Sequence, residues 1–279
     1  MKMHKVVSVL GLSLFLLAAL NSCTKEADNA NDTALGAVVT AADDEIVNIS
    51  FDEATSDSDE AEVVDFSKKG NSVKFQDCAT VTKTKDGDSK TLVIDYGTEG
   101  CTSPRGHIRK GKVIINLTGT RLTTGFVKTI EFENFYLDGN LIEGKRTLTT
   151  TLNGLNLAQH VVVDGGRVTL TDGVVITFDE DKTRTLVEGL ITPLVATDDV
   201  WEVTGTASGM NYNQVEYSML ITKPIRRSAA CKYAVSGTKV ITTANHTATL
   251  DFGDGSCDNK ATVTVGDLVK EIVLGSRWK

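Results

Sequence analysis

Short segments that alternate apolar and polar residues dominate the chain from residue 71 to residue 279. Val113, Ile115 and Leu117, for example, occupy every second position of one segment, and Asp138-Gly139-Asn140 separates two others. Such alternation predicts half-buried strands, and Asp-Gly or Asn-Gly pairs between them predict tight hairpin turns. We expect roughly 14 strands with no amphipathic helix between them, which excludes a parallel βαβ architecture. The predicted fold is all-β, either an antiparallel hairpin-rich sandwich or a curled meander.

Residues 23–70 differ in composition from the rest of the chain. Between Thr24 and Asp65 there are 13 acidic residues and one basic residue, and aromatic residues are scarce. A segment of this kind buries too little apolar surface to offset the entropy of the chain. We therefore expect residues 23–70 to form a largely disordered acidic tether in front of a β-domain, residues 71–279. Four apolar residues within the tether suggest a short docked helix or strand: Ile46, Val47, Ile49 and Phe51.

The body of the chain is nearly neutral. From Phe66 to Lys279 there are 26 basic and 24 acidic residues, so the overall formal charge of −8 belongs to the tether. Binding to nucleic acid depends mainly on basic side chains that neutralise phosphates. We therefore expect no nucleic-acid partner.

The first 22 residues are typical of an export signal. Basic residues precede an apolar run from Val6 to Leu20, and Leu20-Asn21-Ser22-Cys23 follows. An apolar run of this length suits a secretory signal and is short for a membrane span. With a cysteine at the cleavage position, the segment resembles a bacterial lipoprotein signal. The resemblance implies that residues 1–22 are removed and that Cys23 is lipidated, which holds the protein on a membrane. The alternative is an ordinary secreted protein with an incidental cysteine.

The residues after the cysteine bear on which membrane face the protein occupies. Lys25-Glu26-Ala27-Asp28 resembles the short tract of lysine and acidic residues that directs some Gram-negative lipoproteins to the cell surface. The match is partial, because Ala27 interrupts the acidic pair. We expect a lipid anchor in the outer membrane, with display at the cell surface favoured over the periplasmic face.

Two similar segments contain the remaining four cysteines. Asp95-Tyr96-Gly97 precedes Cys101 with the same spacing by which Asp251-Phe252-Gly253 precedes Cys257. A duplicated hairpin unit at the two ends of the β-domain is the simplest explanation. In an exported protein four cysteines imply disulfides with three alternative connectivities. The repeat favours Cys78–Cys101 and Cys231–Cys257 over buried free thiols, and the spacing does not suit a metal site.

Several segments of the body resemble a group of uncharacterised Gram-negative outer-membrane lipoproteins. The resemblance covers essentially the whole body and implies an all-β exported domain, but it brings no known activity or catalytic residue. The segment 251–255 alone also resembles extracellular PKD modules, although Cys257 and the upstream copy at Asp95 are not explained by that match. The segments that carry the first resemblance are 109–114, 132–136, 143–147, 203–209 and 251–261.

Motifs for catalysis are absent from the sequence. His107, His160 and His246 are scattered, and no Gly-x-Ser-x-Gly or nucleotide-binding loop occurs. Glu131 and Glu133 would lie on one face of a strand. Two carboxylates in this position are usually solvent-exposed surface groups, and the alternative is the catalytic pair of a glycosidase. We expect a protein that is not an enzyme and that has no catalytic residue, cofactor or metal.

One cluster of basic residues suggests binding to an anion such as a lipopolysaccharide phosphate or an acidic glycan. The alternative is a set of charges that protects an edge strand from pairing with another chain. The sequence therefore favours a membrane-anchored, non-catalytic envelope lipoprotein whose β-domain serves binding or surface structure, with a glycan or protein ligand of unknown identity. An enzyme that acts on envelope glycans or other polymers through carboxylates is the second hypothesis. The candidate anion-binding residues are Arg105, Arg109, Lys110 and Lys112.

Overall fold

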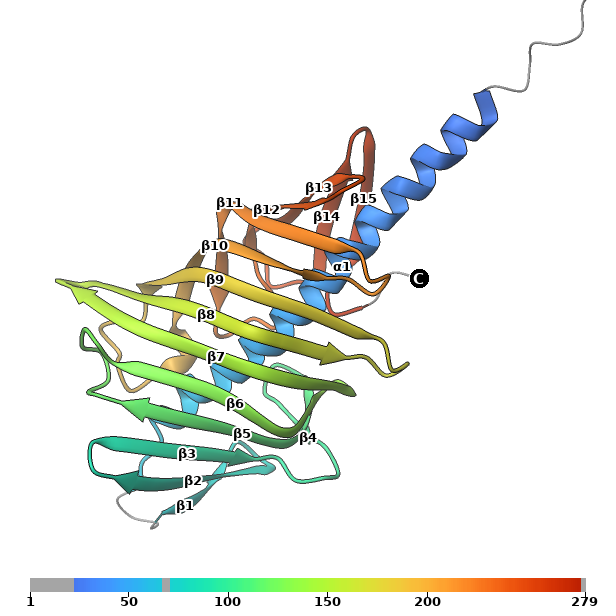
Figure 1. The fold of residues 1–279 in the computed structure, drawn as a ribbon. Helices are drawn as coiled ribbons and strands as arrows, with labels where there is room; N and C mark the ends of the chain where they lie inside the picture. The colour runs from blue at the N-terminus through green and yellow to red at the C-terminus, as the bar shows by residue number, and fades with distance from the viewer. Residues whose placement is uncertain (1–22, 67–70, 277–279) are drawn as a thin grey trace, which may run out of the picture.

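The structure, a computed structural model, describes residues 23–66 and 71–276, with the side chains of residues 23–33 left out. The predicted signal peptide, residues 1–22, lies outside the described residues. The described chain begins with one long helix, α1 (Cys23–Glu62). Figure 1 shows α1 running along the inner side of a curved sheet, with its N-terminal part projecting beyond the strands.

All strands of the described residues belong to one antiparallel sheet, in which each strand pairs with its neighbours in sequence. The exception is β4, which pairs only with β5 and lies beside the main path, so that β3 pairs with β5. A short 3₁₀ helix, η1 (Ala196–Asp198), precedes β10. The strands are β1 (Ser72–Phe75), β2 (Ala79–Asp86), β3 (Ser89–Asp95), β4 (Cys101–Thr102), β5 (Ile108–Thr118), β6 (Val127–Leu137), β7 (Asn140–Asn153), β8 (Asn156–Thr169), β9 (Val175–Glu188), β10 (Val200–Met210), β11 (Glu216–Ser228), β12 (Ser236–Thr243), β13 (Thr247–Asp254), β14 (Lys260–Val265) and β15 (Leu268–Val273).

The prediction of an all-β curled meander is confirmed, and the structure takes this form rather than that of a sandwich. The rule that an Asp-Gly pair predicts a hairpin turn is wrong at Asp164-Gly165-Gly166. These residues form an irregularity inside β8, where the pairing with β9 shifts between Val163 and Gly166. A β-carbon on Gly166 would lie 2.3 Å from the ring of Phe178. A glycine is therefore required there for β9 to pass close to β8.

Alternate side chains of the strands point inward and pack around α1. Val113, Ile115 and Leu117 are buried as predicted. From α1, Phe51 packs edge-on against Phe132 and Phe178, with ring centroids 5.3 and 4.8 Å apart. The curved sheet and the helix therefore share one interior, and α1 is part of the core.

The prediction that residues 23–70 form a largely disordered tether is wrong for residues 34–62. This part is helical, and most of its side chains are buried, including Ile46, Val47 and Ile49. The prediction from composition failed because it considers the segment in isolation. In the folded chain, the carboxylates of the helix form ion pairs with basic residues on strands that are distant in sequence. The short docked element suggested by the apolar residues is the centre of this long helix.

The duplicated hairpin unit has the same local geometry at both ends of the sheet. The carboxylate of Asp95 accepts a hydrogen bond from the Gly97 amide at 2.9 Å, and Asp251 accepts one from Gly253 at 2.8 Å. Both glycines have positive φ angles, +72° and +88°, which side chains disfavour. The predicted disulfides are present, each with its two Cα atoms 5.4 Å apart, in the pairs Cys78–Cys101 and Cys231–Cys257.

Replacing both cysteines of one pair, as in Cys231→Ser with Cys257→Ser, should lower the free energy of unfolding by up to about 3 kcal/mol, because the open loop gains entropy in the unfolded chain. The Cys78–Cys101 bond should still form in this variant, since each bridge closes a local hairpin. Urea unfolding and non-reducing peptide mapping measure the two effects. A recovered peptide that links Cys78 to Cys257 would contradict the local pairing.

Candidate functional site

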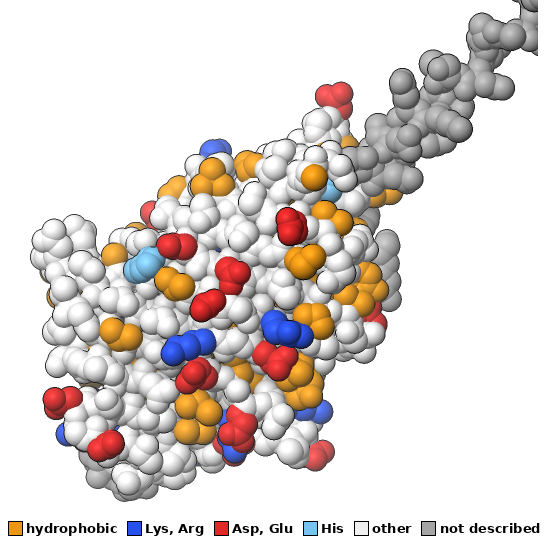
Figure 2. Space-filling view, in the orientation of Figure 1, with side chains coloured by type: hydrophobic (Ala, Val, Ile, Leu, Met, Phe, Trp, Pro, Cys, Tyr) orange, Lys and Arg blue, Asp and Glu red, His pale blue; other side chains and the backbone are white. Residues whose placement is uncertain are grey.

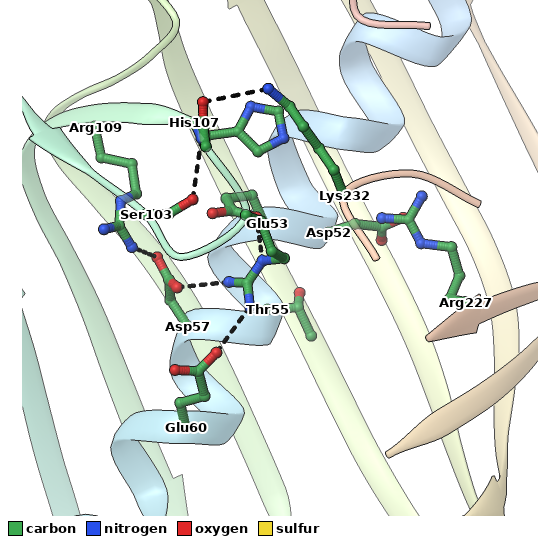
Figure 3. A network of polar contacts seen from close by, with 12 residues as sticks. Asp52, Glu53, Thr55, Asp57, Glu60, Ser103, His107, Arg109, Arg227 and Lys232 are labelled. Atoms are coloured by element: carbon green, nitrogen blue, oxygen red, sulfur yellow. Dashed lines mark hydrogen bonds and ion pairs between the residues drawn. The ribbon is translucent and has the colours of Figure 1, made fainter. Parts of the chain in front are cut away.

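Acidic side chains of α1 meet basic side chains that point inward from the sheet and its loops. Asp57 lies 2.6 Å from Nη1 of Arg109 and 2.8 Å from Nη2 of Arg105, and Asp57 and Arg109 are fully buried. Glu53 and Glu60 hold the other nitrogens of Arg105 at 2.7 and 2.8 Å. Figure 3 shows Asp57 on α1 turned toward Arg109. Two of the predicted anion-binding residues therefore bind carboxylates of the same chain.

The same kind of pairing continues along the whole docked part of the helix. Asp59 lies 3.0 Å from Nη2 of Arg184 on β9, and Asp52 lies 3.0 Å from Nη1 of Arg146 on β7. These ion pairs join α1 to strands that lie on both sides of the middle of the sheet. Further pairs are Lys128 with Asp59 and Glu62, and Lys239 with Asp44 and Glu45.

The electrostatics of these pairs lower the pKa values of Asp52 and Asp59. Burial by itself raises the pKa of Asp59, but the charges of Arg184 and Lys128 outweigh it and bring the pKa down to about 2. Asp52 is similar: burial is outweighed by Arg227, Arg146 and Lys182, and its pKa also falls to about 2. Both groups therefore stabilise the fold above their ordinary pKa of 3.8, and this stabilisation is lost as the pH falls toward 2.

The other two predicted anion-binding residues point outward. Lys110 is exposed, and Lys112 forms a partly exposed ion pair of 2.7 Å with Glu133 on β6. The alternation of β5 thus divides the cluster, with Arg109 inside and Lys110 outside. The edge-strand alternative is wrong for this strand, because β5 pairs on one side with β3 and on the other with β6.

A cavity of about 50 Å³ lies between α1 and the inner side of β7 to β11. Trp201 contributes one wall, and the guanidinium of Arg184 stacks 4.0 Å from its ring. The volume suits a few water molecules or one small ion and excludes a polymer. The charged residues that line the cavity are Arg105, Arg146, Lys182, Arg184, Arg227 and Lys232, with Asp52, Glu53 and Asp59.

Two histidines of the described residues, His107 and His160, each pair with an aspartate. Nδ1 of His107 lies 2.6 Å from Asp138, and its Nε2 is buried without a hydrogen-bond partner. The backbone amide of His107 donates a hydrogen bond to Oγ of Ser103 at 3.1 Å, while the ring pairs with Asp138. His160 pairs with Asp181 on the exposed side of the sheet at 2.7 Å. Within the described residues, no cluster of three or more His, Cys, Asp or Glu residues could hold a metal ion.

The pKa of the Asp199 carboxyl group is raised into the neutral range. Burial raises the pKa of Asp199 to about 7, and the nearby charge of Asp59 adds to this effect. Two carboxyl groups with widely separated pKa values are the pattern of a general acid and base. The cavity between them, however, is only about 20 Å³, too small for a substrate.

A wider hollow lies on the opposite, outer face of the sheet. This groove has a volume of about 780 Å³ and crosses β8 to β12. Figure 2 shows this face with acidic and basic side chains interspersed among polar and apolar ones. The outward side chains that line it are carboxylates, hydroxyls and a few aliphatic groups: Val162, Asp164, Asp179, Asp181, Thr206, Ser208, Ser218, Leu220, Val240 and Thr242.

Comparison of the chain with protein-family models, with curated proteins and with solved structures finds no match. The function must therefore be argued from the geometry. Among the described residues, no helix has the length and apolar content needed to span a membrane.

Most of the inward basic residues were missed by the sequence-based prediction. Their position in the alternating pattern of the strands could have identified them as inward-facing. Lys128 lies two residues before the buried Ile130, and Arg184 lies two residues before the buried Leu186. A basic residue at an inward position of a predicted strand requires a buried acidic partner. The acidic segment before the β-domain was the only large source of such partners, so the two signals together could have predicted the docked helix.

Arg109→Gln should lower the free energy of unfolding by about 3–5 kcal/mol, because it leaves the buried Asp57 carboxylate without its closest cation. Lys110→Gln is the matched control, because the neighbouring side chain is exposed and should change stability by less than about 0.5 kcal/mol. Urea unfolding of the two variants measures the difference. Equal stabilities would contradict the role assigned to the buried ion pairs.

Asp199→Asn should change how stability depends on pH. The folded state of the wild-type protein keeps a proton on Asp199 up to about pH 7, while the ordinary pKa is 3.8, so this group makes stability fall as the pH rises between these values. The variant lacks this contribution, and its stability should increase relative to wild type across the same range. Thermal unfolding from pH 4 to 8 measures the difference, with Asp267→Asn at an exposed turn position as control. Parallel curves for wild type and Asp199→Asn would contradict the prediction.

Proposed function

We propose that the chain is a membrane-anchored, non-catalytic envelope lipoprotein whose β-domain serves binding or surface structure. The export signal and Cys23 support the anchor, and the tract that follows the cysteine supports an outer-membrane protein that faces the cell surface. The membrane is then the first partner, reached through the lipid, and a glycan or a protein is the second.

The observation that carries this proposal is the continuity of α1. The helix begins at Cys23 and ends at Glu62, and its second half is fixed in the sheet by buried ion pairs. At 1.5 Å per residue, a helix of this length measures about 60 Å, and Figure 1 shows its N-terminal part outside the sheet. A lipid on Cys23 would therefore be joined to the body through a helix that fixes the orientation of the sheet relative to its point of attachment.

The outer groove supports a role in binding. Its carboxylates and hydroxyls offer hydrogen-bond acceptors and donors, and Leu220, about half exposed, offers an apolar contact. Such a lining suits a hydroxylated chain such as a glycan or an extended polypeptide. The interspersed charges on this face give no continuous basic surface for nucleic acid (Figure 2).

An enzyme acting through carboxylates is the alternative, and the geometry supports it less. Glu131 and Glu133 lie on the outer side of β6, where Lys112 pairs with Glu133 and Asn116 approaches Glu131 at 3.4 Å. Asp59 and Asp199 have separated pKa values, but the cavities beside them do not admit a polymer. A soluble form that begins after Cys23, assayed on a panel of glycans and peptides, separates the two functions. Turnover that is lost on a single Asp or Glu substitution would establish the alternative.

Cys23→Ala should move the protein from the membrane fraction to the soluble or unprocessed fraction, because the acyl chains then have no attachment site. Metabolic labelling with an alkyne fatty acid, followed by membrane fractionation, measures both effects. Thr24→Ala is the control and should keep the label. Label that persists on Cys23→Ala would remove the basis of the proposed anchor, and protease treatment of intact cells would test surface exposure separately.

A further inference from the structure

Exposed aliphatic side chains gather at one end of the sheet. Leu155 is 82% exposed, Ile191 93% and Leu194 77%. Of the ten large apolar residues that are exposed in the described chain, five lie on or beside two connections at this end. We call these five residues the apolar rim: Leu155, Val187, Ile191, Leu194 and Val195.

The topology places the members of the apolar rim side by side. In the antiparallel meander the connections β5–β6, β7–β8 and β9–β10 lie at the same end of the sheet. The β9–β10 connection, residues 189–199, reaches back across this end, because Nη1 of Arg121 in the β5–β6 connection donates to the carbonyl oxygen of Pro193 at 2.5 Å. The hairpin turn that carries Leu155 lies between β6 and β9 in the strand order, so the β9–β10 connection passes beside it.

The β9–β10 connection holds its exposed side chains in a fixed arrangement. The amide of Thr192 donates to the carbonyl oxygen of Gly189 at 3.0 Å, and the amide of Val195 donates to that of Thr192 at 2.8 Å. Leu190 packs inward against a buried cluster that includes Trp201. A connection that is already ordered loses little entropy when its exposed side chains are covered by a partner.

The apolar rim contains no charge, and charges at its border are paired. No charged residue occurs in residues 189–197. At the border, Glu188 forms an ion pair with Arg226, and Arg121 forms one with Glu62 at 3.3 Å. Because these border charges already have partners of opposite sign, they do not repel an identical patch on another molecule.

The area of the apolar rim suits one side of a homodimer interface. Its five side chains expose on the order of 500 Å², which lies in the upper part of the range for the largest apolar patch on a monomer. A standard interface buries about 800 Å² per partner, and about 65% of the area is apolar in homodimers, which is again roughly 500 Å². A second copy of the rim therefore offers an apolar surface of the required size.

The position of the rim disfavours a bilayer as its partner. Arg121, which holds the β9–β10 connection, pairs with Glu62, the last residue of α1. Cys23 lies at the other end of the helix, about 60 Å away along its axis. Figure 1 shows the end of β7 that leads to Leu155 and the projecting N-terminal part of α1 on opposite sides of the molecule. This step rests on the proposed anchor, because it is the lipid of Cys23 that would place the membrane at the far end of the helix.

We propose that the apolar rim is the contact surface of a homodimer, in which the rim of one copy covers the rim of a second copy across a two-fold axis. In a contact of this type the same patch serves both subunits, so a residue near the axis lies opposite its own counterpart. A two-fold axis perpendicular to a membrane leaves both α1 helices on the same side, so both copies can be anchored in one membrane.

Sedimentation equilibrium of the full-length protein in a density-matched detergent measures the mass of the assembly. The wild-type protein should have twice the monomer mass at low micromolar concentrations. Ile191→Asn combined with Leu194→Asn should weaken the dimer at least tenfold, because polar amides then replace apolar groups in the contact. Val269→Asn is the matched control, because Val269 on β15 is also exposed but lies outside the rim.

Cysteine crosslinking tests the same contact in native membranes. Leu155→Cys, Ile191→Cys and Leu194→Cys are oxidised one at a time, and at least one should form a covalent dimer, whereas Val269→Cys should not. Cys23→Ala protein should dimerise in detergent as the wild type does, so that the dimer and the proposed anchor are tested separately.

Three results would each overturn the proposal: wild-type protein that stays monomeric at about 100 µM, a dimer that persists when both Ile191 and Leu194 are replaced, or no crosslink at any rim position. A polarity-sensitive dye on Leu194→Cys distinguishes a bilayer from a second copy. Quenching of this dye by brominated lipids in phosphatidylcholine vesicles would assign the rim to the bilayer and would likewise overturn the homodimer.

Discussion

The ion pairs buried between α1 and the sheet are the interaction on which the rest of the structure depends. Arg109 and Asp57 are both fully removed from solvent, 2.6 Å apart. A charge in this position is tolerated only beside its partner, because an unpaired buried ion costs far more than the pair. The strands therefore require the helix as much as the helix requires the strands. The β-domain and the segment before it form one cooperative unit, although their sequences differ strongly in composition.

These charges also explain how a helix with so many carboxylates can occupy a core. Apolar side chains of similar volume would stabilise the interior about as well as buried ion pairs do. What the pairs add is register: each residue along a helix turns it by about 100°, so a slip by one position would carry Asp44, Asp52 and Asp59 away from their partners together. We infer that the ionic contacts fix where the helix lies in the sheet, while Phe51 and its aromatic neighbours supply the apolar contact.

The elements that depend on neighbours in sequence were predictable, and those that depend on distant partners were not. Alternation at Val113, Ile115 and Leu117 predicted which side of β5 is buried, and the Asp-aromatic-Gly repeat predicted both disulfide pairs. The full length of the docked helix was missed because its stability comes from cations that lie up to 195 residues away, as between Lys239 and Asp44. The candidate anion site was misplaced for a related reason: residues adjacent in sequence on a strand face opposite sides, so Arg109 and Lys110 never belonged to one surface.

The net charge of the body does not reveal the pairing between helix and sheet, because it sums the charges on both sides of the sheet. The body has nearly equal numbers of basic and acidic residues, yet much of its buried charge is basic and faces the helix, as Arg146, Arg184 and Lys239 do. The acidic residues of the helix therefore balance basic residues that face the interior of the sheet. An acidic segment of this kind need not be a solvated linker. The match between helix and sheet is closest around Asp57, where each donor of Arg105 meets a carboxylate oxygen.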